Sequence, residues 1–358
     1  MKTGAEFCKP IATDKDSGRF ADWVVGITLV FLIGLCDPPG WAQRALVLVG
    51  SGSSVPAPLY NRWAQEYNKR DSAIQVDYLS IGTSEGIKQI SDDIGDFGAG
   101  EVPLTDRDRN ERHLTEIPSM LIAIVPIYNL PGVLADLRLS GNVLAEIFLG
   151  QVKTWNDSRI ARLNPDVSLP NLPIKVVYRP AGKGSNYIFT EFLSKTSSDF
   201  RSRIGTSASP SWPVGKPATG SSGMADKVRS EVGSIGYVEA QYAVIAGIQS
   251  ARVLNPAGRY VKASPQTLAA ACLAVEAPSW DAFSASLTNG PGADSFPITS
   301  FTWLYLSTPS ADPRRATALG DLLNWIFTDG EQLATQEGYS ALPKPLLAKV
   351  KARVRALH

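Results

Sequence analysis

The chain has 358 residues, of which 44% are hydrophobic and 19% charged, and its formal net charge is +1. This composition is that of an ordinary globular protein, and the length is sufficient for two domains. A nearly neutral chain lacks the basic footprint of a nucleic-acid-binding protein, so we expect no nucleic acid partner. No long run of like charges indicates a membrane-surface patch.

An almost wholly apolar, uncharged run lies near the N-terminus at residues 23–36. It is shorter than the roughly 20 residues that span a bilayer, and the small residues Gly40 and Ala42 follow it. We therefore interpret residues 1–42 as a signal peptide that directs the chain to the periplasm. The polar segment before the run is unusually long, and an uncleaved membrane anchor is the alternative. After cleavage only Cys272 would remain, so no intramolecular disulfide is expected.

Three successive strand-loop-helix units follow the apolar run. Segments 46–49, 74–79 and 96–99 have the pattern of strands, and each precedes a loop rich in small or hydroxyl-bearing residues. Helices are predicted after the first two loops, at residues 56–67 and 87–92. This order indicates an α/β protein with an open parallel sheet, whose ligand would lie at the carboxyl ends of the strands.

The rest of the chain has a different pattern of predicted strands and helices. The apolar stretch 120–128 predicts a buried strand that carries the chain into a second lobe. Further helices are predicted at 139–149, 155–163, 188–194, 220–231, 316–327 and 344–356, and further strands at 236–238 and 301–306. No internal repeat is present.

One loop in this part of the chain has the character of an anion site. The segment 177–187 is expected to form a strand, a loop and the start of a helix. Gly182 and Gly184 allow several backbone N–H groups to point into one concavity at the positive end of that helix. Arg179 adds a planar cation that matches two oxygens of a tetrahedral anion, and Ser185 adds a hydroxyl. A solvent-exposed glycine turn is the alternative interpretation.

The residues that enzymes and metal sites require are scarce. The mature chain would contain two histidines, His113 and His358, which excludes a histidine-rich metal site and restricts a catalytic triad to His113. The spacing of acidic residues shows no calcium loop, and no P-loop is present. We expect no catalytic residue, no metal and no cofactor.

Several motifs together resemble the periplasmic phosphate-binding proteins of ABC phosphate uptake systems. The similar segments are 50–60, 81–89, 96–99, 103–106, 147–152, 155–157, 163–165, 177–190, 233–239 and 297–300. They run in the same order over essentially the whole mature chain. So extended an agreement identifies the chain as a member of this family.

The resemblance implies a particular architecture and role. The fold would be a two-lobed α/β periplasmic binding protein of type II, each lobe an open, mostly parallel sheet flanked by helices, with two crossing hinge strands. Lobe one would comprise residues 44–121 plus 300–358, and lobe two residues 122–299. The protein would capture phosphate between its lobes and deliver it to the membrane subunits of an ABC permease. It would act as a monomer and would not be an enzyme.

The family's ligand-binding positions can be carried over by motif. They fall on Ser54, Val55, Thr83, Glu101, Arg179, Lys183, Gly184 and Ser185. The first four would come from lobe one and the last four from lobe two.

Three positions depart from the family pattern. Gly100-Glu101 stands where the family has Ser-Asp, Ala181 where it has Asp, and Lys183 where it has Ser. A carboxylate in such a site accepts a hydrogen bond from protonated phosphate and repels sulfate, which has no proton to give. Glu101 retains that group, whereas Ala181 and Lys183 make the pocket more positive. Lys183 could point to solvent, pair with Glu101 or contact the ligand.

Two alternative functions remain open at this point. The first is a receptor of the same fold for a different oxyanion: a phosphate ester, phosphonate, arsenate or sulfate-like ion. The second is a non-transport exported protein, either a sensory or adhesion protein or, less favoured, a phosphatase.

Overall fold

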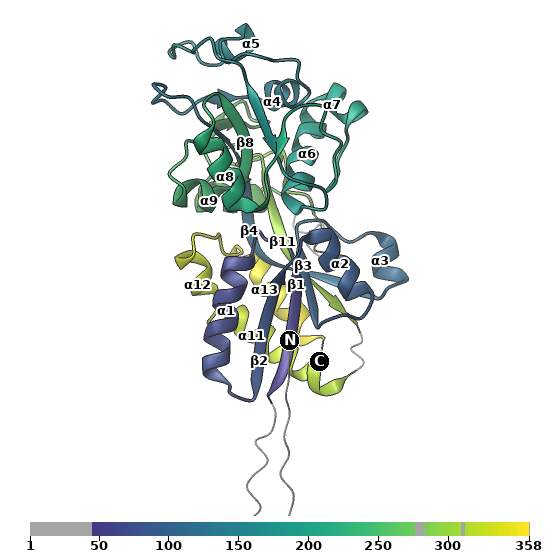
Figure 1. Ribbon diagram of the computed structural model, residues 1–358. Helices are drawn as coiled ribbons and strands as arrows, with labels where there is room; N and C mark the ends of the chain where they lie inside the picture. Colours follow the sequence, from purple (N-terminus) through teal and green to yellow (C-terminus); the bar gives the residue numbers. More distant parts are fainter. Residues whose placement is uncertain (1–44, 276–282, 284, 309–311, 358) are drawn as a thin grey trace, which may run out of the picture. The chain divides into compact units, whose positions relative to one another are not determined.

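A single mixed sheet of eight strands organises the part of the chain described by the computed structural model, residues 45–275, 283, 285–308 and 312–357 (Figure 1). The strand order is β2-β1-β3-β11-β4-β8-β6-β7. These strands are β1 (Leu46–Gly52), β2 (Ile74–Ser80), β3 (Phe97–Gly100), β4 (Leu114–Tyr128), β6 (Lys175–Tyr178), β7 (Lys216–Pro217), β8 (Ser234–Glu239) and β11 (Thr299–Ser307). The signal peptide expected at residues 1–42 lies outside the described residues.

The sheet contains two groups of three parallel strands. Strand β1 is parallel to β2 and β3, and β6 is parallel to β7 and β8. Between these groups, β11 runs antiparallel to both β3 and β4. The parallel units predicted for the first hundred residues are therefore confirmed. A smaller sheet contains β5 (Arg138–Leu139), β9 (Arg252–Leu254) and β10 (Tyr260–Val261).

Strand β4 connects the two groups of parallel strands, because it pairs with β11 on one side and with β8 on the other. Its first part, up to Ala123, pairs with β11, and its last five residues, from Ile124, pair with β8. The sequence predicted only the apolar stretch 120–128, but the strand begins at Leu114. Pro118 and the acidic Glu116 concealed the first part, and the β4–β11 register shifts next to Pro118, where proline cannot donate to the ladder.

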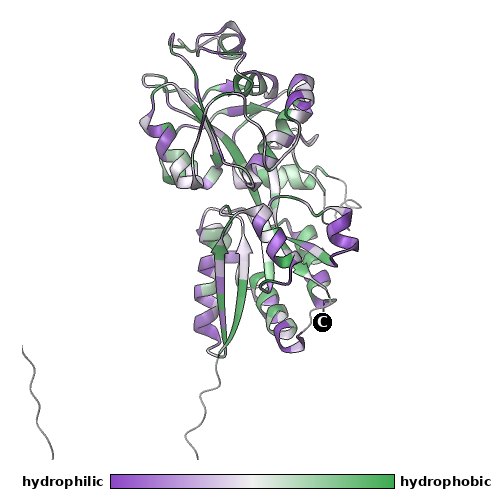
Figure 2. Ribbon diagram, turned by 45° about the vertical axis from the view of Figure 1, so that its right-hand side comes forward, coloured by the Kyte–Doolittle hydropathy of each residue, from purple (hydrophilic) through white to green (hydrophobic). Residues whose placement is uncertain are grey.

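Helices cover the strands. They are α1 (Ala57–Arg70), α2 (Thr83–Ser91), α3 (Asp106–Asn110), α4 (Gly141–Phe148), α5 (Ser158–Ala161), α6 (Gly184–Thr196), α7 (Ser198–Arg203), α8 (Gly220–Ser230), α9 (Ala240–Ile245), α10 (Pro265–Leu273), α11 (Pro313–Ile326), α12 (Glu331–Gln336) and α13 (Lys344–Arg355). Hydrophobic residues are concentrated in the strands and hydrophilic residues on the helices (Figure 2). Among the described residues, no helix is both long enough and apolar enough to cross a bilayer.

Two helices extend beyond their amphipathic runs at the N-terminal side. Helix α2 starts at Thr83, and α6 starts at Gly184, inside the segment 177–187 where a helix start was predicted. The first four residues of these helices are mostly Gly, Ser, Thr and Asn, which have low intrinsic helix propensity. Their helical conformation is therefore imposed by tertiary contacts, and it brings both helix N-termini into the region described next.

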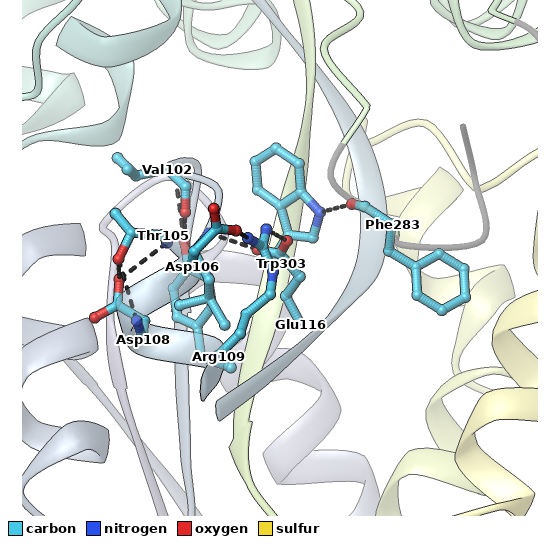
Figure 3. A network of polar contacts seen from close by, with 10 residues as sticks. Val102, Thr105, Asp106, Asp108, Arg109, Glu116, Phe283 and Trp303 are labelled. Atoms are coloured by element: carbon cyan, nitrogen blue, oxygen red, sulfur yellow. Dashed lines mark hydrogen bonds and ion pairs between the residues drawn. The ribbon is translucent and has the colours of Figure 1, made fainter. Parts of the chain in front are cut away.

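The segment after β3 is fixed by a buried network around Glu116 (Figure 3). The Leu104 N–H donates to Glu116 Oε2 at 2.7 Å, and Arg109 Nη2 donates to Glu116 Oε1 at 2.6 Å. The Tyr305 hydroxyl on β11 donates to the Val102 carbonyl at 2.6 Å. These bonds fix the backbone of residues 102–104, immediately after Glu101, at Val102 and at Leu104.

Candidate anion-binding site

Glu101 lies at the carboxyl end of β3 and is fully buried. The Thr83 hydroxyl at the start of α2 donates to Glu101 Oε2 at 3.0 Å, and the Thr302 hydroxyl on β11 donates to Oε1 at 3.2 Å. Burial raises the pKa of Glu101 to about 7, although the hydrogen bonds from Ser53, Thr83 and Thr302 oppose the shift. The carboxyl group thus titrates near neutral pH.

Gly184, the first residue of α6, packs directly against this carboxylate. A Cβ atom on Gly184 would overlap the Glu101 carboxylate and would lie 2.8 Å from Thr83 Oγ1. Next to this contact, the Ser84 N–H donates to the Gly182 carbonyl at 3.4 Å. The loop after β6 therefore lies on the start of α2, and glycine is required for the close approach.

The Arg179 side chain is also buried, with 2% of the residue exposed. Its Nη1 donates to Ser221 Oγ at 3.2 Å, and its Nη2 donates to Ser54 Oγ at 3.3 Å. Its backbone N–H donates to the Tyr237 hydroxyl at 3.1 Å, and Asn186 donates to its carbonyl at 3.2 Å. Arg179 is thus held by strands and helices that are far apart in sequence.

Lys183 lies at the edge of this cluster, beside Gly82. A Cβ atom on Gly82 would lie 2.7 Å from Lys183 Nζ. Partial burial, and secondarily the charge of Arg179, lower the pKa of Lys183. Within the described chain, no carboxylate oxygen lies within 4.0 Å of this ammonium group, so the pairing with Glu101 considered above is not present.

The remaining predicted residues adjoin the same cluster. Ser185 Oγ is buried, and it has no hydrogen-bond partner among the described residues. The Val55 N–H donates to Ser53 Oγ at 3.1 Å, and the Val55 carbonyl accepts from the Tyr339 hydroxyl at 2.8 Å. Val55 is thus positioned from both sides, with its amide directed to Ser53.

Four helices of nine or more residues begin at this cluster without a side-chain cap: α1 follows Ser54, α2 contains Thr83, α6 contains Gly184 and α8 contains Ser221. The shorter α9 also begins here without a cap, directly after Glu239. Elsewhere, α3, α4, α10 and α11 are each capped by a Ser, Thr or Asp side chain, whereas α12 and α13 are not. Helix N-termini carry partial positive charge and N–H groups without intrahelical partners. Their convergence here provides donors for an anion.

The cluster also contains Ser53, whose hydroxyl the sequence offered as a candidate beside Ser54. Three further polar residues belong to it and were missed from the sequence: Ser221, Glu239 and Thr302. Two of these three carried a usable signal. Ser221 follows Gly220 at the start of a predicted helix, and Glu239 ends a short apolar strand, which is the position of a ligand-binding residue in a parallel sheet. Thr302 lies within β11, where its sequence context resembles that of any strand residue.

The described residues contain no group of three or more His, Cys, Asp or Glu side chains that could hold a metal ion. The chemistry of the cluster is instead that of hydroxyls, helix N-termini, one buried guanidinium and the two buried carboxyls of Glu101 and Glu239. Such groups bind a small oxyanion through preorganised dipoles that replace its hydration.

The shifted pKa of Glu101 predicts a pH dependence of stability. Its pKa rises from 4.5 to about 7 on folding, so between these values the folded chain holds a proton that the unfolded chain has lost. The free energy of unfolding should therefore fall as pH rises through this window, by at most roughly 3 kcal/mol, and then level off. Chemical denaturation of the anion-free protein from pH 4.5 to 8 measures this.

The Glu101→Gln variant isolates the contribution of this one group. The difference in unfolding free energy between wild type and variant should change across the window. A difference that stays constant between pH 4.5 and 8 would show that Glu101 does not titrate there.

Comparison with known proteins places this geometry in a class. Residues 37–330 match the PBP superfamily domain. Among solved structures, a high affinity periplasmic phosphate-binding protein bound with phosphate superposes with a TM-score of 0.67 at 20% identity, covering 86% of this chain and 93% of that one. The phosphate binding protein of Stenotrophomonas maltophilia gives 0.62 at 19% identity, covering 86% and 94%. The fold is that of the two-lobed periplasmic binding proteins.

Sequence relatives narrow the class. The phosphate-binding protein PstS of Pasteurella multocida is 36% identical over 311 residues, which cover 87% of this chain and 90% of that protein. The PstS protein of Xylella fastidiosa (strain Temecula1) is 33% identical over 347 residues, covering 96% and 92%. The chain belongs to the PstS family of phosphate-binding proteins.

Proposed function

We propose that this chain captures inorganic phosphate outside the cytosol and delivers it to an ABC permease in the membrane. The observation that carries the proposal is the convergence of four uncapped helix N-termini on the buried Arg179 guanidinium and the Glu101 carboxyl. The family relationship supports phosphate as the anion and an ABC permease as the partner. The relatives named above are phosphate-binding proteins by name.

The proposed ligand contacts come from Ser54, Val55, Thr83, Glu101, Arg179, Lys183, Gly184 and Ser185. The division of the chain into lobe one (44–121 plus 300–358) and lobe two (122–299) is part of the proposal. Contacts such as that of Arg179 with Ser54 and that of Gly184 with Glu101 then join the two lobes. Phosphate would favour this closed arrangement, because only there do both sets of donors reach it.

Discrimination among oxyanions would depend on Glu101. An ionised carboxylate accepts a hydrogen bond from the proton of hydrogen phosphate and repels sulfate. Lys183 and Ala181 oppose this selectivity, because the first adds a charge and the second removes the family's acid beside the arginine. We infer that the protein binds and releases its ligand as a monomer without covalent chemistry, and that it reaches the periplasm through the N-terminal signal.

Isothermal calorimetry of the mature chain tests the proposal. The protein would first be freed of anion by partial unfolding and dialysis, and then titrated with phosphate, arsenate, sulfate and a small phosphate ester at neutral pH. Tight binding of phosphate with exclusion of sulfate is expected. A preference for sulfate or the ester would mean that Ala181 and Lys183 have changed the ligand, and turnover of the ester would reveal an enzyme.

A further inference from the structure

Glu239 is a buried acid at this site that none of the predicted ligand contacts uses. It ends β8, directly before α9, and none of its surface is exposed. Neither of its carboxylate oxygens has a hydrogen-bond donor among the described residues. A buried carboxylate without hydrogen bonds is costly unless a nearby positive charge compensates it.

The compensating charge is Arg179. Its Nη1 lies 4.0 Å from Glu239 Oε1, and Glu239 is the one acid within ion-pairing distance of Arg179 in the described part of the chain. The separation exceeds a hydrogen bond, so the guanidinium donors are not consumed by this carboxylate. Arg179 Nε likewise has no partner among the described residues.

The residue at position 181 makes the pairing of Arg179 with Glu239 important for the charge of this site. The resemblance drawn from the sequence implies an acid two residues after the arginine, whereas this chain has an exposed Ala181. Arg179 therefore has no acid at that position, and its charge is compensated by an acid from another strand. The cations of the site are Arg179 and Lys183, and its acids are Glu101, after β3, and Glu239, at the end of β8.

We propose that Glu239 is the counter-charge of Arg179 and thereby a specificity-determining residue, which weakens the preference of the site for doubly charged over singly charged anions. This inference deepens the proposed function and rests on it for the identity of the ligand. Glu239 acts through Arg179 and is a positioning residue. Its charge also interacts with Glu101 and with the phenols of Tyr242 and Tyr339.

The first part of the test needs no ligand. A double-mutant cycle combines Arg179→Met with Glu239→Gln, and the unfolding equilibrium of each anion-free variant is measured by chemical denaturation. Each single change leaves one buried charge without its partner, whereas the double change removes both. We expect a favourable coupling of tenfold or more in the unfolding equilibrium constant. A coupling below twofold would overturn the counter-charge assignment, whatever the protein binds.

The second part measures selectivity. Glu239→Gln keeps the side-chain shape and leaves Arg179 bonded to Ser221 and Ser54. The ratio of phosphate affinity at pH 8, where phosphate is mostly doubly charged, to that at pH 5.5, where it is mostly singly charged, should rise at least fivefold relative to wild type, because an uncompensated guanidinium favours the doubly charged anion. Adding Ala181→Asp, which places an acid beside the arginine, should return most of the ratio to the wild-type value. Glu111→Gln, at the exposed C-terminal end of α3, makes the same charge change at the surface and should leave the ratio unaltered.

The outcomes separate the two proposals. Equal losses of phosphate affinity at both pH values, with their ratio within twofold of wild type, would mean that Glu239 is structural only and would overturn its role in specificity. A wild-type chain that binds phosphate at neither pH would overturn the proposed function. In that case the coupling measured without anion still decides whether Glu239 is the counter-charge of Arg179.

Discussion

Replacing Arg179 with methionine should weaken phosphate binding by about 4 kcal/mol, roughly a thousandfold, because a desolvated, charge-assisted contact is lost. The Arg179 residue is 2% exposed, and its guanidinium donates hydrogen bonds to the hydroxyl oxygens of Ser54 and Ser221. Methionine retains much of the volume, so the change removes charge and donors rather than packing. Calorimetric titration with phosphate measures the effect.

A second arginine substitution serves as the control. Arg229→Met, on α8, removes an exposed arginine that pairs with Asp226 at 3.2 Å. Exposed ion pairs contribute little, so phosphate affinity should change less than twofold. An Arg179→Met protein that is folded by circular dichroism and binds within twofold of wild type would remove Arg179 from the site.

The Gly184→Ala substitution should weaken phosphate binding by about 3 kcal/mol, roughly a hundredfold, from a single added methyl group. The new Cβ would overlap the Glu101 carboxylate, which is buried and held by Thr83 and Thr302. Relief of the overlap requires α6 to move away from the carboxyl end of β3 and from the amino-terminal half of β11, where Thr302 lies. The donors of the two segments then no longer reach one ligand together.

Gly223→Ala is the matched control for this prediction. Gly223 lies within α8, and a Cβ at that position would meet nothing within 4 Å. Alanine there should leave phosphate affinity unchanged and should stabilise the helix by up to about 1 kcal/mol. Equal phosphate affinities for wild type and Gly184→Ala would show that the contact between α6 and Glu101 is not needed for binding.

The sequence alone determined the class of the fold and the segments that would carry the site. Alternation of apolar strands, small-residue loops and amphipathic helices gives the parallel units around β1, β2 and β3, because these patterns depend only on local periodicity. The glycine loop after β6 and the single nearby arginine also indicated an anion site from local chemistry. The order of the motifs supplied the family.

Tertiary structure decided which side chains of those segments meet. Helices α2 and α6 begin with residues of low helix propensity, and contacts between the two loops stabilise those first turns. Thr302 reaches Glu101 from a strand some two hundred positions later, which no local pattern encodes. The pairing of charges is likewise non-local. Glu239 lies beside Arg179 because β8 pairs with β6. The sequence shows that position 181 lacks an acid, but it does not show which other acid accompanies Arg179. The physical reason is that local periodicity fixes elements, whereas burial and pairing between distant elements fix the environment of each charge.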